Sequence, residues 1–166
     1  MLNNQSIKIE CEPYLIRFLE KLYGPSPIDF PPKSNFLMFL DIFLSEPPAN
    51  YLESIPDDKC LEVRLPNIEK TKLQGFNYLS PLARRIFLKE VNKFFKTSFR
   101  NEIIKYITIG LSKKDSIDMF LYEFNLPEDS RDRLLREYVN HIRNTRKKKK
   151  LKIKGWDIKV GNENKC

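Results

Sequence analysis

Arginine and asparagine side chains recur between residues 131 and 146, and both carry the donors that proteins use to recognise bases in DNA. Arginine can bond guanine through two donors, and asparagine can bond adenine through a donor and an acceptor. The candidates for such contacts are Arg133, Arg136, Asn140 and Arg143. The same helix is predicted to bury a stripe made of Leu134, Leu135, Tyr138, Val139 and Ile142, which leaves the candidates on its other faces.

A run of cations follows these residues and forms a basic arm. The arm begins with Arg146, Lys147, Lys148, Lys149 and Lys150 and extends to Lys154. Arg131–Lys154 carries eleven cations against two carboxylates, a net charge of +9, and the whole chain is +8. Clustered cations release condensed counterions when they neutralise phosphates, so we expect a polyanionic partner. Because lysine is a point charge, the arm should bind the phosphate backbone or a minor groove without sequence preference.

These side chains need a scaffold that presents them to DNA. Three successive helices are predicted, at about residues 98–109, 113–124 and 130–146. This outline is typical of a helix-turn-helix unit, in which the last helix enters the major groove and the preceding helix crosses the backbone. Residues Ser112, Lys113 and Lys114, at the start of the middle helix, would then meet phosphates.

The connection between the last two helices leaves an alternative open. A helix-turn-helix turn has about three or four residues and often contains glycine. Asn125–Ser130 has six residues and no glycine. A plain antiparallel helical hairpin with a basic outer face fits the same pattern.

The first half of the chain has the patterns of strands and helices in alternation. Residues 6–11 and 61–65 alternate apolar and polar positions as half-buried strands do, and 71–78 is a candidate hairpin partner of the second strand. Helices are predicted from Pro13 to Gly24 and again around 36–43.

The predicted fold class is α+β in three parts. A mixed α/β unit spans 1–78, a helical region spans 79–146, and a basic arm with a strand-like tail spans 147–166. Ser80 and Pro81 are predicted to begin the helical region. The tail alternates over 151–160, like a strand with a bulge, and both an ordered edge strand and an arm that binds a partner fit this pattern. The mixed unit is the candidate for partner contacts, including a homodimer formed through an exposed strand edge.

The residues favour a protein that is not an enzyme and has no cofactor. The single histidine, His141, has no neighbouring serine or cysteine nucleophile, and Tyr138 is assigned to the buried stripe. The carboxylates form no nuclease-like metal pattern. Three cysteines without a CxxC pair do not predict a zinc site.

Two further observations concern location and packing. The apolar segment 36–44 is broken by Asp41 and too short to span a bilayer, and the N-terminus does not resemble a signal peptide. A cytoplasmic protein without a membrane partner is therefore predicted. The phenylalanines at helical spacing are predicted to pack in a core and not to stack on bases; they are Phe36, Phe39, Phe43, Phe94 and Phe95.

The segment SKKDSIDMFLYEFNLPEDSRDRLLREYVNHIRNTRKKKK resembles small helix-turn-helix proteins of bacterial phages and mobile elements. The shared features are a polar-capped helix, an Asn-x-Pro turn and a basic helix with a basic extension. The resemblance implies that Arg133, Arg136, Asn140, Arg143 and Arg146 contact bases or phosphates.

The function predicted from these features is non-catalytic binding of double-stranded DNA, by a transcriptional regulator or an accessory factor of a phage or mobile element. The alternative is a structural or interaction protein whose basic arm docks on an acidic protein or on RNA.

Overall fold

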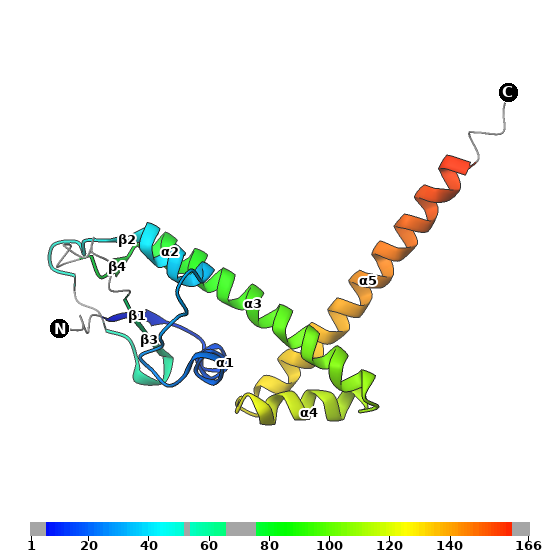
Figure 1. Cartoon of the computed structure of the whole chain (residues 1–166), viewed down its shortest axis with the longest axis horizontal. Coiled ribbons are helices and arrows are strands. Elements are labelled where there is room, and N and C mark those ends of the chain that lie inside the picture. The colour runs from blue at the N-terminus through cyan, green and yellow to red at the C-terminus, as the bar shows by residue number, and fades with distance from the viewer. Residues whose placement is uncertain (1–5, 52–53, 66–75, 161–166) are drawn as a thin grey trace. The chain divides into compact units, whose positions relative to one another are not determined.

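The computed structural model describes residues 6–51, 54–65 and 76–160, and the side chains of those up to Thr145. Figure 1 shows five helices in this part of the chain: α1 (Pro13–Tyr23), α2 (Asn35–Phe43), α3 (Pro81–Thr108), α4 (Lys113–Glu123) and α5 (Ser130–Val160). The strands are β1 (Ser6–Glu10), β2 (Leu44–Ser45), β3 (Cys60–Arg64) and β4 (Tyr78–Leu79), and a short 3-10 helix spans Asp57–Lys59. The predicted α+β class is confirmed.

Two short antiparallel ladders organise the first half. In the first, β1 pairs with β3 so that Ile7 lies opposite Val63 and Ile9 opposite Leu61, and all four side chains are buried. Ile28 adds a parallel bridge to Val63 from the other side of β3. The strand predicted at 61–65 therefore has partners on both sides at Val63, and β3 is not a free edge there.

The second ladder links the end of α2 to the start of α3. Leu44 lies opposite Leu79 and Ser45 opposite Tyr78, so the two helices come to lie side by side (Figure 1). The sequence predicted that 71–78 would pair with the strand at 61–65. Residues 66–75 lie outside the described part of the chain, and Tyr78 pairs with β2.

Local capping signals set where the central helices begin and end. The Ser80 hydroxyl accepts a hydrogen bond from the Ala83 N–H, and the Ser112 hydroxyl accepts one from the Asp115 N–H, both at 3.2 Å. Gly110, with φ of +100°, follows the end of α3 in a conformation that favours glycine. Both predicted N-caps are confirmed, and α3 continues without a break through residue 98.

Aromatic rings form the centre of the core, as predicted. Phe18 of α1 is fully buried and lies against Phe94, Phe95 and Phe124, with centroid separations of 5.7, 5.0 and 5.3 Å. Phe36 joins α2 to α3 through Phe87, at 5.8 Å. The core therefore ties α1 and α2 to the long helix α3.

Helix α3 buries a single stripe of side chains. Its buried residues recur every four positions: Ala83, Phe87, Val91, Phe95, Phe99 and Ile103. Leu82, Ile86 and Ile104 also have the helical spacing of an apolar face, but they are exposed. A strict four-residue spacing drifts around a helix with 3.6 residues per turn, so the buried stripe winds around α3 instead of following one side.

Two predictions about the last helix are wrong. Of the predicted stripe only Leu134 is buried, whereas Leu135 and Val139 are exposed at 49% and 44%. Residues 151–160 are helical and not a strand, because α5 continues to Val160. Extending an existing helix needs no new nucleus, and lysine and leucine favour helix.

The chain divides into two compact units, Met1–Glu128 and Asp129–Cys166. The second unit is built on α5. The position 78/79, predicted as a domain boundary, lies within β4, and α3 packs with α1 and α2 in the first unit.

Candidate nucleic-acid interface

The predicted base-reading residues share one face of α5. Arg133, Arg136, Asn140 and Arg143 are separated by three, four and three residues, and all four are exposed. At 100° per residue, these positions fall within about 80° of the helix circumference. The next position of this series is Lys147, in the basic arm. The helix therefore aligns three arginines and an amide along one exposed face.

The chemistry of this face suits a polyanion. Arginine keeps its charge at any physiological pH and offers planar donors to phosphate or to guanine. The Arg136 Nε donates to the backbone carbonyl of Asp132 at 3.3 Å, which steadies the stem of its side chain along the helix. Asp132 and Glu137 are the carboxylates of this stretch, so positive charge dominates between residues 131 and 145.

The arm continues the same helix. The backbone over Arg146, Lys147, Lys148, Lys149 and Lys150 is helical, as part of Ser130–Val160. Consecutive positions of a helix lie 100° apart around its axis, so the four lysine positions are spread over most of the circumference. The arm is thus a cationic rod, and only part of it can face one strand of DNA at a time.

The start of α4 is less suited to phosphate than predicted. Lys113 and Lys114 are exposed there and belong to the first compact unit. The Asp115 carboxylate accepts a hydrogen bond from the Ser112 hydroxyl at 2.6 Å, so a negative group already lies at this N-terminus. A carboxylate stabilises the positive end of a helix but repels a phosphate at the same place.

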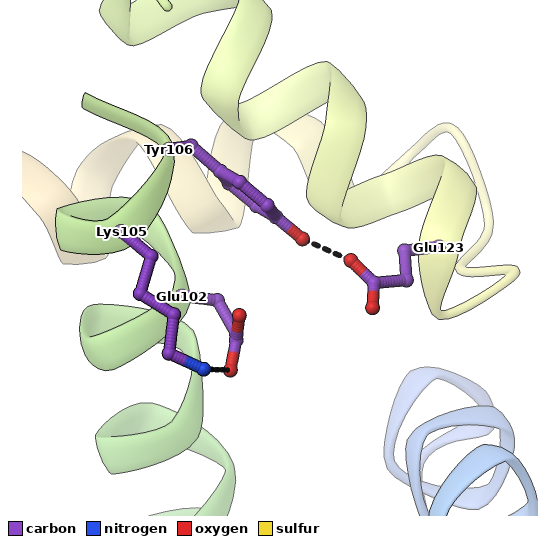
Figure 2. A network of polar contacts seen from close by, with 4 residues as sticks. All are labelled: Glu102, Lys105, Tyr106 and Glu123. Atoms are coloured by element: carbon purple, nitrogen blue, oxygen red, sulfur yellow. Dashed lines mark hydrogen bonds and ion pairs between the residues drawn. The ribbon is translucent and has the colours of Figure 1, made fainter. Parts of the chain in front are cut away.

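A polar contact holds α4 against α3. Figure 2 shows the Tyr106 hydroxyl of α3 pointing at the Glu123 carboxylate of α4, to which it donates a hydrogen bond. Burial raises the pKa of Tyr106, and the hydrogen bond and charge of Glu123 raise it further. On the same helix, the Lys105 ammonium lies 2.6 Å from Glu102. The Tyr106–Glu123 contact supplements the apolar packing of Phe99 on Phe120 between the two helices.

We expect Tyr106→Phe to lower the free energy of unfolding by about 1 kcal/mol at pH 8, because it removes this hydrogen bond. In the unfolded chain the pKa of this tyrosine returns to its ordinary value of about 10. Above that pH the unfolded state loses the proton first, so the stability that the raised pKa contributes falls as pH rises past about 10. The wild-type protein should therefore lose more stability between pH 8 and pH 11 than Tyr106→Phe. Urea unfolding at both pH values measures this. Tyr122→Phe, at an 86% exposed position, is the control and should match the wild type.

Other chemistry-bearing residues of the described chain are dispersed. Among the described residues no cluster of three or more His, Cys, Asp or Glu side chains is arranged to hold a metal ion. Burial raises the pKa of the Cys11 thiol to about 12, so it stays protonated at neutral pH. His141 is half-buried on α5. No helix in the described part of the chain is long and apolar enough to cross a membrane.

One aromatic pocket lies beside α3 in the first unit. It has a volume of about 360 Å³ and is walled mainly by Tyr23, Phe36, Phe39, Phe87 and Phe94. Phe36 and Phe87 are buried, and Phe39 and Phe94 are half-buried. The predicted core packing is confirmed for Phe36 and Phe95 but is wrong for Phe43, which is 42% exposed at the end of α2.

Comparison with protein-family models, with curated proteins and with solved structures finds no match to this chain. The likeness to helix-turn-helix proteins therefore stays a prediction.

Proposed function

We propose that this protein binds double-stranded DNA without catalysing a reaction on it, as a regulator or accessory factor of a phage or mobile element. The observation that supports the proposal is the shared face of α5. This face is exposed and carries Arg133, Arg136, Asn140 and Arg143. The same helix continues directly into Lys147–Lys150. Base-reading donors and a phosphate-binding arm on one helix match the requirements of a DNA-contacting helix.

The two parts of α5 would have different tasks. Arginine and asparagine can distinguish bases in the major groove, whereas lysines add affinity for any sequence. Fluorescence anisotropy with a random 30-mer duplex, at low and at physiological salt, tests binding itself. Binding that falls steeply with salt supports the proposal. Absence of binding at low salt would contradict it.

Substitution of the reading face tests the division of tasks. We expect Arg136→Ala or Asn140→Ala to weaken binding to a selected site by about 1–3 kcal/mol and to change binding to random DNA much less. Site selection from a duplex library, followed by titration of both variants, measures this. Asn77→Ala, at an exposed position of the first unit, is the control. Equal losses on selected and random DNA would show that the face contacts only phosphates.

A further inference from the structure

Helix α3 carries a row of exposed cations that is separate from the basic residues of Arg131–Lys154. Opposite its buried stripe, a ridge of exposed residues recurs every four positions: Arg85, Lys89, Lys93, Thr97, Asn101 and Lys105. We call these six residues the basic ridge. Four of them are cations, none is a carboxylate, and at 1.5 Å per residue the ridge is about 30 Å long.

Helix α3 has a net positive charge, whereas the residues outside α3 and Arg131–Lys154 have a net negative charge. Pro81–Thr108 holds seven cations and two carboxylates, a net charge of +5. With +9 in Arg131–Lys154 and +8 overall, the remaining residues are net −6. Surfaces that serve only for solubility mix both signs. Outside Arg131–Lys154, the excess of positive charge lies on α3, and the other residues together are negative.

The ridge cations are available for an external partner. Within the part of the chain that the structure describes, Arg85 and Lys89 make no hydrogen bond or ion pair. Lys93 lies 3.5 Å from Glu90 and Lys105 lies 2.6 Å from Glu102, each three residues away on the same helix. Both side chains of the Lys93–Glu90 pair are exposed, whereas Glu102 is half-buried beside the exposed Lys105. An exposed pair such as Lys93–Glu90 is worth at most about 1 kcal/mol, so a phosphate can compete for Lys93.

We propose that the basic ridge is a second contact surface for the phosphate backbone of the duplex. This inference rests on the proposed function, because it assigns the same DNA to a second surface. One strand of duplex presents about one phosphate per 3.4 Å of axis, so about nine phosphates lie along the length of the ridge. Arg85, Lys89 and Lys93 place a cation about every 6 Å along the first part of the ridge, and Lys105 adds a fourth about 18 Å further on. The ridge can therefore meet several phosphates. The ridge supplies affinity from the first unit, in addition to the affinity that α5 supplies.

The test uses the full chain with the arm already neutralised by Lys147→Gln, Lys148→Gln, Lys149→Gln and Lys150→Gln. The ridge variant adds Arg85→Gln, Lys89→Gln and Lys93→Gln. The matched control adds instead Lys21→Gln, Lys33→Gln and Lys59→Gln, which remove the same charge from exposed positions of the same unit. Glutamine keeps the helix propensity of α3. Circular dichroism checks that each variant is folded.

Anisotropy with the 30-mer duplex is measured from 50 to 200 mM salt. The ridge substitutions should reduce the slope of log affinity against log salt by about 2 to 3, since each phosphate contact contributes about 0.9. The control should reduce it by less than about 1. If the wild type binds and the ridge and control variants change equally, the inference is overturned and the proposed function stands. If the wild type does not bind the duplex at low salt, both are overturned.

Discussion

Phe18→Ala should cost about 3–5 kcal/mol of unfolding free energy, the largest stability effect expected in this protein. The ring is fully buried and contacts Phe94 and Phe95 of α3 as well as Phe124 at the end of α4. Its removal loses the free energy of transferring the ring out of water and also leaves a cavity. The neighbouring aromatic rings relax into this cavity only in part, so their packing contacts are lost as well. Domains of this kind are stable by about 5–15 kcal/mol, so the variant should be close to unfolding.

Urea unfolding followed by circular dichroism measures this loss. Leu22→Ala, on the same helix at a 43% exposed position, is the control and should cost about 1 kcal/mol or less. Phe18→Leu should fall between the two, because leucine fills part of the cavity. If Phe18→Ala and Leu22→Ala cost the same, α1 does not anchor the core through this ring.

Local signals in the sequence were sufficient to predict most elements of the fold. A serine before a proline begins α3, and a serine three residues before an acid begins α4, because each supplies the acceptor that the first turn lacks. Alternation predicted β1 and β3. All of these signals act over a few residues, so no knowledge of the tertiary structure was needed.

The failures concern partners that are distant in the sequence. Tyr78 pairs with Ser45, and nothing in either two-residue strand specifies the other. Leu82 and Ile86 have the spacing of an apolar face, but the stripe that packs against the other helices follows Ala83 and Phe87. Residues 151–160 alternate like a strand, yet a strand needs a neighbour, whereas a helix that is already formed can extend alone.

The candidate interface was only partly predictable for the same reason. The shared face of Arg133, Arg136 and Asn140 follows from helical spacing, and the sequence contains it in full. The basic ridge of α3 could have been found by the same four-residue spacing. Its cations do not stand out as a contact surface in the sequence, because the same helix also holds glutamates and the core aromatics. The solvent exposure of the side chains in the structure distinguishes the basic ridge from the buried stripe of that helix.

Neutralising Lys147, Lys148, Lys149 and Lys150 together should have the largest effect on DNA binding. Each phosphate contact contributes about 0.9 to the salt slope. Because the four positions spread around α5, we expect two or three contacts and a loss of about 2 to 3 in the slope. Affinity between 50 and 200 mM salt should then fall far less steeply than in the wild type. Preference for a selected site should be unchanged, since lysine does not read bases.

The control for the arm is the quadruple variant Lys8→Gln, Lys21→Gln, Lys33→Gln and Lys59→Gln, which changes the net charge equally at exposed positions of the first unit. An equal loss in both variants would mean that only net charge matters and that no arm exists. Single substitutions sharpen the test. Lys147 continues the face of Asn140 and Arg143, while Lys149 lies about 200° further around the axis. If α5 presents one face to the duplex, Lys147→Gln must weaken binding more than Lys149→Gln does.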